Sequence, residues 1–123
     1  AIRTLVGEGR SINVTLIFSV NQALLAALAG ASFLSPFVGR LDDVSYDGME
    51  LIKQCVTLVE THNLSARVLA ASMRHPLHVM QAAAAGAHVA TIPAALIAQM
   101  LKHPLTDIGI DRFLADARTA GLV

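Results

Sequence analysis

The chain has 123 residues, enough for one domain or for part of a larger one. Hydrophobic residues make up 54% and charged residues 15% of it, against about 25% charged in an ordinary soluble domain, and this composition excludes intrinsic disorder. Nine Lys and Arg balance nine Asp and Glu. A neutral chain of this kind argues against nucleic-acid binding and against a basic membrane-binding patch.

Two stretches without charged side chains, from Arg10 to Arg40 and from Arg74 to Lys102, are long enough to cross a bilayer. The first is interrupted by Asn, Gln, Gly and Pro, and the second by His, Gln and Pro. Several of these residues would lie near the middle of the bilayer at high cost. We therefore predict elements buried within a soluble, cytoplasmic protein, with no membrane partner and no secretory signal. Cys55 is the single cysteine, which fits a reducing compartment.

The first half of the chain alternates between strand and helix patterns. A β-branched apolar run predicts a buried parallel strand at residues 13–18, and an Ala/Leu-rich segment predicts a helix at 19–30. A second strand is expected at 32–38. The sequence GRLDDVSYDG is then expected to form a loop, which leads into an amphipathic helix at 49–63.

The second half repeats the alternation. A third strand is expected at residues 67–72, and a helix that begins at His75-Pro76 follows it, because proline suits the first helical turn. A fourth strand is expected at 88–92, with a short helix at 94–101. A final helix is expected at 106–120, with Thr106 and Asp107 in its N-cap region.

Four strands alternating with helices predict a parallel α/β fold. A weak repeat adds to this, because Gly30 and Gly86 lie 56 residues apart and each precedes an alanine and a strand. Half of a (β/α)8 barrel would show such a two-unit repeat. An open four-stranded sheet with flavodoxin-like winding fits the same elements, and the pattern alone leaves both open.

In either fold a ligand binds at the carboxyl ends of the strands. Arg40 and Arg74 follow two predicted strands, and Ser72 lies beside the second arginine. Arginine forks bind phosphate through two parallel hydrogen bonds, so these residues predict a phosphate pocket. The alternative is that both arginines are solvated loop residues paired with Asp42 or Asp43.

Other reactive side chains receive structural interpretations. His75 and His78 are three residues apart but lack a third metal ligand, and we expect them to cap a helix or lie on the surface. Cys55 is expected to be a buried structural thiol. The Asp42-Asp43 pair is interpreted as loop and helix-entry charge rather than as acid/base groups. Three methionines are expected in the core, namely Met73, Met80 and Met100.

Three segments carry a resemblance to a known family: NVTLIFSVNQALLAALAGASFLSPFVGRLDD, VLAASMRHPLHVMQAAAAGAHVATIP and KHPLTDIGIDRFLADA. From residue 13 to 117 the chain resembles the short bacterial and archaeal transaldolases related to fructose-6-phosphate aldolase. The resemblance implies a (β/α)8 TIM barrel. Residues 1–123 would be its C-terminal half, with strands five to eight and their helices, and the N-terminal half would lie outside the chain.

The resemblance implies a transferase of the pentose phosphate pathway that moves a dihydroxyacetone unit between sugar phosphates. Sedoheptulose 7-phosphate and glyceraldehyde 3-phosphate would give erythrose 4-phosphate and fructose 6-phosphate, through a Schiff base on a lysine. No cofactor and no metal is implied. Short transaldolases assemble as rings, often decamers, so a homo-oligomer in which the last helix reaches a neighbour is expected.

The resemblance also assigns site residues. Thr15 would be catalytic and would help to position the catalytic water. Ser35 would contact a substrate hydroxyl, and the phosphate would be held by Arg40, Ser72 and Arg74. Phe37 stands where the related aldolases carry a tyrosine, and a phenylalanine there favours transfer over release. The substrate-binding set is thus Ser35, Phe37, Arg40, Ser72 and Arg74.

The Schiff-base lysine belongs to strand four, which would precede residue 1. Lys53 and Lys102 are the only lysines, and neither is predicted at a strand end, where a lysine pKa could be lowered. We therefore expect the chain alone to be inactive and to need the missing N-terminal half as a partner. The alternative is a non-catalytic half-barrel that binds sugar phosphates or assembles with itself.

Overall fold

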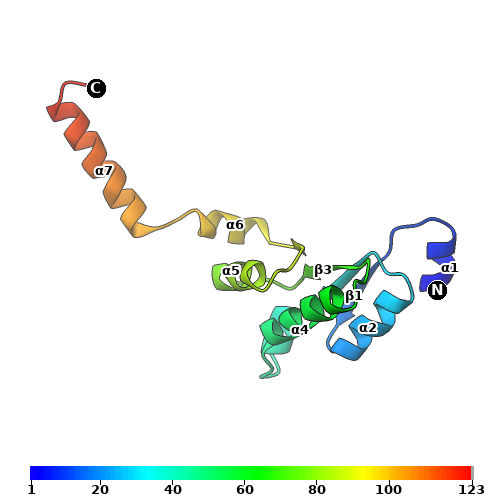
Figure 1. Cartoon of the computed structure of the whole chain (residues 1–123). Coiled ribbons are helices and arrows are strands. Elements are labelled where there is room, and N and C mark those ends of the chain that lie inside the picture. The colour runs from blue at the N-terminus through cyan, green and yellow to red at the C-terminus, as the bar shows by residue number, and fades with distance from the viewer. Residues whose placement is uncertain (123) are drawn as a thin grey trace.

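A parallel four-stranded sheet lies at the centre of the chain (Figure 1), whose residues 1–122 are described by a computed structural model. The strands are β1 (Asn13–Ile17), β2 (Phe33–Pro36), β3 (Arg67–Ala70) and β4 (Val89–Ala90). They lie in the order β1-β2-β3-β4, so each strand pairs with the next one along the chain. The predicted parallel α/β arrangement is confirmed. Because the order contains no reversal, it excludes a doubly wound open sheet and matches consecutive strands of a (β/α)8 barrel.

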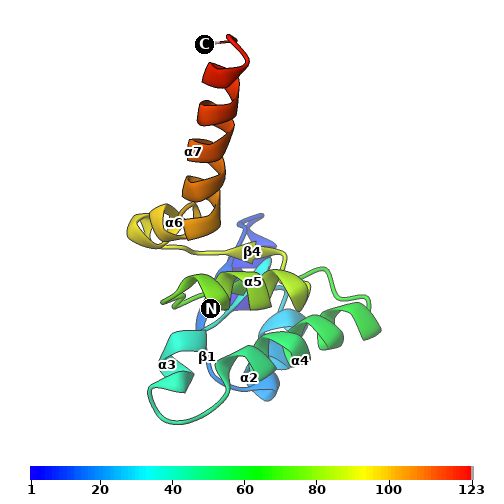
Figure 2. The same cartoon turned by 90° about the vertical axis from the view of Figure 1, so that its left-hand side faces the viewer.

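Three helices form one layer against the sheet (Figure 2): α2 (Val20–Leu28), α4 (Gly48–Thr61) and α5 (Pro76–Ala84). Side-chain oxygens cap two of them. The Ser19 hydroxyl accepts a hydrogen bond at the start of α2, and the Asp47 carboxylate accepts two at the start of α4. These caps satisfy backbone donors that a helix leaves free at its first turn, and they fix where each helix begins.

The hydrophobic core lies between this helix layer and the sheet. Ile17, Leu34 and Val68 point toward the helices from three neighbouring strands, and none is more than 1% exposed. Cys55 of α4 packs in the same core and is fully buried, as predicted for a structural thiol. Burial raises the pKa of this thiol to about 11, because a thiolate is poorly solvated there.

No helix within residues 1–122 covers the opposite face of the sheet. Side chains alternate along a strand, so residues in register with one another share a face. Asn13, Phe33 and Arg67 are aligned across β1, β2 and β3, and all three are exposed or half-buried. Leu69 and Val89 continue the row onto β4 and are also half-buried. In a closed barrel this face would line the interior.

Three further helices lie toward the two ends of the chain. α1 (Ile2–Gly7) precedes β1, and α6 (Ala94–Met100) follows β4. α7 (Pro104–Thr119) projects away from the sheet in both views (Figures 1 and 2), and none of its residues is buried. Leu105 and Phe113 of α7 are 69% and 75% exposed. Within residues 1–122, no helix combines the length and the apolar character that a bilayer crossing requires.

Two predicted boundaries are wrong. The expected loop after β2 contains a short helix, α3 (Val38–Asp42), which forms because the chain turns directly from β2 to pack against β3. The last helix begins at Pro104 and not at Thr106, because proline fits the first turn and the His103 ring caps the helix. The imidazole Nδ1 accepts the Leu105 N–H at 3.2 Å, so Thr106 and Asp107 lie inside the first turn.

The prediction of three core methionines is only partly confirmed. Met73 is buried, at 3% exposure. Met80 and Met100 are 60% and 44% exposed, so their placement in the core is wrong. Both line an apolar hollow between α5 and the end of α6, where Pro76 and Leu77 also lie. Methionine suits such an irregular outer contact, because its side chain is flexible.

Candidate functional site

The predicted site residues lie along β1 and β2 and at the carboxyl ends of β2 and β3. Ser35 of β2 is 2% exposed, and its hydroxyl donates a 2.7 Å hydrogen bond to Oδ1 of Asn13 on β1. Thr15 lies two residues after Asn13 on β1 and is exposed. A register shift follows between Val14 and Ile17, where Leu16 adopts φ 56°. This bulge bends β1 just beyond Thr15.

Phe37 follows the last residue of β2 and joins two other side chains. Its ring packs edge-to-face against Phe18, with centroids 6.0 Å apart. The Arg40 guanidinium carbon lies 5.1 Å from the Phe37 ring centroid, within cation–π distance. Arg40 itself is exposed and is the third residue of the short helix α3. The aromatic ring therefore supports one of the two predicted phosphate-binding arginines.

Ser72 lies in the segment between β3 and α5, in close contact with α3. Its backbone carbonyl accepts the Gly39 N–H at 3.0 Å, and its φ of 61° is in the left-handed region. A Cβ atom on Gly39 would come within 2.5 Å of the Ser72 oxygen and 2.6 Å of Arg74 Nε. Only a glycine allows this approach. The two segments that carry Arg40 and Arg74 thus touch directly.

The Arg74 guanidinium forms a two-pronged ion pair with Asp43. Nη2 lies 2.6 Å from Oδ2, and Nη1 pairs with Oδ1. Both side chains are about half exposed. The hydrogen bond from Arg74, together with the charges of Arg74 and Arg40, holds the pKa of Asp43 below its usual value. The alternative prediction, in which an arginine pairs with Asp43, is therefore confirmed for Arg74. Arg40 lies against the Phe37 ring instead.

This pairing shows what the arginine cluster can do chemically. A guanidinium fork binds a carboxylate and a phosphate with the same parallel hydrogen bonds. Arg40, Asp43 and Arg74 thus form a cluster, in which Arg74 pairs with the Asp43 carboxylate and the charge of Arg40 also stabilises it. Phosphate binding by Arg40, Ser72 and Arg74 stays a prediction. The structure brings the three residues to one edge of the sheet.

His78 differs from its prediction, because it is neither a cap nor a surface residue. It is 6% exposed, and its Nε2 lies 3.0 Å from Oδ2 of Asp42. Its pKa is lowered by burial and, second, by the neighbouring His75. Four residues further along α5 is Ala82, which is also buried. That spacing was the available signal, because residues four apart share one helix face.

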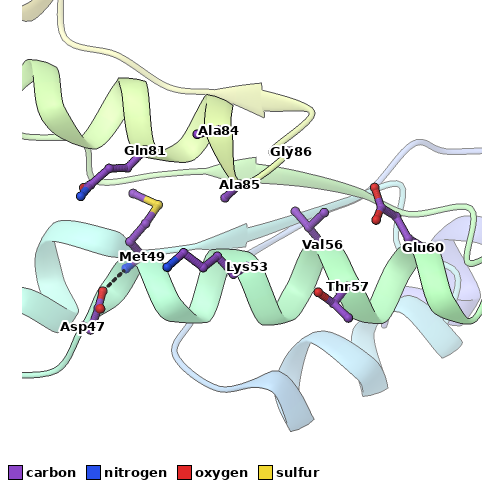
Figure 3. Close-up of a pocket in the computed structure, with 10 residues that line it drawn as sticks. All are labelled: Asp47, Met49, Lys53, Val56, Thr57, Glu60, Gln81, Ala84, Ala85 and Gly86. Atoms are coloured by element: carbon purple, nitrogen blue, oxygen red, sulfur yellow. Dashed lines mark hydrogen bonds between the residues drawn. The ribbon is translucent and has the colours of Figure 1, made fainter.

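Two hollows lie near or beside these residues. A hollow of about 480 Å³ is formed by Phe18, Leu41, Val44 and Tyr46 together with Arg40, so it adjoins the arginine cluster. A second groove of about 500 Å³ lies between α4 and α5 (Figure 3). None of the predicted site residues lines the second groove.

Figure 3 shows the α4–α5 groove. Met49 extends from α4 toward Gln81 on α5, Lys53 lies beside Met49, and Glu60 lies at the opposite end of the groove. The Lys53 Nζ atom lies 3.6 Å from a Glu50 carboxylate oxygen and its side chain is 56% exposed, unlike the desolvated lysine that Schiff-base chemistry uses. As for metals, no group of three His, Cys, Asp or Glu side chains within residues 1–122 is arranged to hold an ion.

Sequence reasoning missed Asn13, which accepts the Ser35 hydrogen bond and shares the uncovered sheet face. A polar side chain in phase with Thr15 on an apolar strand was a usable signal. It also missed the contact between Asp42 and His78. No sequence pattern announces that contact, because it joins side chains 36 positions apart.

The family model described as Transaldolase/Fructose-6-phosphate aldolase matches residues 1–121. This chain belongs to the transaldolase/fructose-6-phosphate aldolase family. The resemblance found in the sequence is thereby confirmed, and the family's fold is a (β/α)8 barrel.

Curated members of the transaldolase family agree with this assignment. A "Probable transaldolase" of Thermoanaerobacter sp. (strain X514) is 55% identical over 122 residues, which are 99% of this chain and 56% of that protein. One of Desulforudis audaxviator (strain MP104C) is 59% identical over 116 residues, 94% of this chain and 54% of that protein. The chain thus spans about half the length of the curated transaldolases it matches.

Solved structures show the fold alone. Crystal structures of mandelate oxidase variants match 74% of this chain and 28% of theirs, with a TM-score of 0.58 and 22% identity.

Proposed function

We propose that this chain is the C-terminal half of a transaldolase barrel, and that it supplies the phosphate-binding side of the active site. The whole enzyme would be cytoplasmic and would transfer a dihydroxyacetone unit between sugar phosphates through a lysine Schiff base. Family membership supports the reaction class. The chain's length, about half that of its curated relatives, supports the proposed half-barrel.

The cluster of Arg40, Asp43 and Arg74 at the carboxyl ends of the strands carries this proposal. In (β/α)8 barrels the active site lies at this end, built from the segments that follow the strands. Arg74 already binds a carboxylate there, and the charge of Arg40, from the preceding segment, acts on the same group. A sugar phosphate would replace Asp43 on the Arg74 fork, and Ser72 would contribute its hydroxyl beside the fork.

The uncovered sheet face supports the remaining roles. Ser35 and Thr15 occupy the strands that would line the barrel interior, where the sugar chain would lie. Thr15 would position the catalytic water, and Ser35 would bind a substrate hydroxyl. Phe37 would disfavour hydrolysis of the Schiff base, because a phenylalanine cannot hold the attacking water as a phenol can. This favours transfer to an acceptor aldehyde.

The Schiff-base lysine would come from the N-terminal half, which would also cover the open face. Lys53 lies mid-helix on α4, and Lys102 follows α6, so neither ends a strand. The chain alone would therefore be inactive. The exposed apolar side chains of α7 support a homo-oligomer, in which this helix would pack on a neighbouring subunit. The same open face also supports a non-catalytic half-barrel that closes on a second copy of itself.

Borohydride trapping tests the proposal. The chain is incubated with fructose 6-phosphate and sodium borohydride, alone and mixed with the N-terminal part of the Thermoanaerobacter relative. Intact mass then shows which polypeptide carries the reduced adduct. We expect an adduct only in the mixture, on the relative's part. An adduct on the chain alone would refute the proposal. A mixture that forms a complex but no adduct would favour the non-catalytic half-barrel.

A further inference from the structure

His78 is the one buried residue among the five histidines, all of which lie in the described range. Its ring reaches two segments at once. Nε2 lies 3.0 Å from Oδ2 of Asp42, the last residue of α3. Nδ1 accepts the backbone N–H of Arg74 at 3.4 Å. The imidazole therefore joins α3 to the segment between β3 and α5.

The two contacts define one protonation state of the ring. An Nδ1 that accepts a hydrogen bond carries no proton, so the single proton of a neutral imidazole is on Nε2, where it is donated to Asp42. The second oxygen of Asp42 accepts the Gly48 N–H at 3.0 Å, at the start of α4. Every polar atom of the His78–Asp42 pair that faces another segment thus has a partner.

The segments that this pair joins are those that carry the arginine cluster. Arg40 and Asp42 both lie on α3, and Arg74 supplies the backbone N–H that His78 accepts. Three other described polar contacts join these segments: the Val38 N–H to the Ala71 carbonyl, the Gly39 N–H to the Ser72 carbonyl, and the ion pair between Arg74 and Asp43 at the end of α3. The relative position of the two guanidinium groups depends on this small set of contacts.

We propose that His78 and Asp42 are positioning residues, which hold Arg40 and Arg74 at the spacing for one phosphate group only while the imidazole is neutral. This inference rests on the proposed phosphate site. A second proton on Nδ1 would place an N–H against the Arg74 N–H, and two donors repel each other. The ring would then lose its link to Arg74, and the segment between β3 and α5 would move away from α3.

The surroundings of His78 keep the ring neutral near pH 7. Its pKa is lowered first by burial and then by the charge of His75, whose ring centroid is 3.6 Å away, with a smaller effect from Arg74. Asp42 acts in the opposite direction. Asp47, Lys53 and Glu60 of α4 face the groove shared with α5 and are not among the groups that shift the His78 pKa. The hydrogen bond that neutral His78 accepts from the Arg74 N–H is therefore present above the ordinary histidine pKa. It is lost as the pH falls through the lowered pKa of His78.

Sulfate is a suitable probe, because it stays a dianion across the range in which histidine titrates. Its affinity for the full chain is measured by NMR shift titration between about pH 7.5 and about pH 5. Simple electrostatics predicts stronger sulfate binding in acid, because the net positive charge of the chain rises. The proposed role of His78 predicts the reverse. The sulfate affinity of the wild-type chain should fall in acid by about two- to ten-fold, which corresponds to the free energy of one hydrogen bond.

Two variants isolate the ring. His78→Asn keeps an acceptor where Nδ1 lies but does not titrate, so its sulfate affinity is expected not to fall in acid. His78→Phe removes both contacts and is expected to bind sulfate weakly at every pH. His88→Asn is the matched control, since His88 Nδ1 also accepts a backbone N–H, that of Val68 at 3.1 Å, away from the arginines. This control is expected to keep the wild-type pH profile.

The outcomes separate this inference from the proposed function. Sulfate affinity that depends on pH in the same way in wild type and His78→Asn would overturn the inference and leave the phosphate site intact. No sulfate binding by the wild-type chain at any pH would overturn both. If His78→Phe does not fold, the His78→Asn variant and the ¹⁵N shifts of the His78 ring still test the inference. The proposed role of His78 requires a proton on Nε2 and none on Nδ1 at neutral pH.

Discussion

The contact between α3 and the segment after β3 predicts a strong and unusual response to Gly39→Ala. Alanine is normally the better helix residue, by up to about 1 kcal/mol. At this position the added Cβ atom would lie 2.5 Å from the Ser72 carbonyl oxygen and 2.6 Å from Arg74 Nε, against 3.4 Å for an ordinary contact. The Ser72 backbone would therefore have to move by about 1 Å, and cores tolerate little such movement.

The expected free-energy change follows from three effects. Overpacking costs about 1–3 kcal/mol. Stretching the hydrogen bond from the Gly39 N–H to the Ser72 carbonyl costs about 1 kcal/mol. The helix preference of alanine offsets up to about 1 kcal/mol of this. We expect Gly39→Ala to lower the free energy of unfolding by about 1–3 kcal/mol, and to weaken sulfate binding because Arg74 is displaced.

Urea unfolding of the full chain, followed by circular dichroism, measures this change. Gly109→Ala is the matched control, because Gly109 lies in α7 with nothing within 4 Å of its added Cβ. The control is expected to keep or raise the unfolding midpoint and to add helical signal. A Gly39→Ala chain as stable as the Gly109→Ala chain would refute the close approach of α3 to Ser72, and with it the idea that this contact sets the arginine spacing.

Three further predictions use the same chain. Arg74→Ala should cost about 1.5–3 kcal/mol in sulfate or sugar-phosphate binding. Arg67→Ala, at the amino end of β3, should cost nothing, and equal affinities of the two variants measured by calorimetry would remove Arg74 from the site. Asp43→Asn should free the Arg74 fork and tighten sulfate binding by up to about five-fold, and weaker binding would mean that Asp43 orients the fork instead of competing for it. Cys55, whose pKa burial raises to about 11, should react with a thiol reagent at pH 8 only when the chain is unfolded in urea, and rapid labelling of the folded chain would contradict its burial.

Local sequence patterns predicted the order and type of most elements here, because burial follows their period. The apolar run that contains β1 and the 3.6-residue period of α4 both reflect a face that packs in the core. The patterns failed where a contact between distant segments decides the structure. α3 is helical because Val38 and Gly39 bond to Ala71 and Ser72, and no residue within α3 encodes that contact.

The candidate site follows the same division. Arg40 and Arg74 could be placed near each other from topology alone, since parallel strands end at one edge of the sheet. The pairing of Arg74 with Asp43 was weighed as an alternative, and the structure contains it. The burial of His78 against Asp42 was not predicted, because a histidine beside a proline at a helix start is more often exposed. The four-residue spacing to Ala82 indicated a buried helix face, but only the packing of α5 against α3 reveals Asp42 as the partner.

In the proposed half-barrel, the two parts of the candidate site would depend differently on the N-terminal half. The arginine cluster is built from α3 and the segment after β3, which consecutive units of this chain hold together through Gly39 and His78. Ser35 and Thr15 lie instead on strands whose inward face has no cover within residues 1–122. Anion binding should therefore survive in the chain alone, whereas sugar positioning and Schiff-base chemistry should appear only when another half closes the sheet. The chain could instead fail to bind sulfate alone but bind it in a complex with the N-terminal part of a relative. That result would contradict this division, because phosphate binding would then depend on contacts outside α3 and the segment after β3.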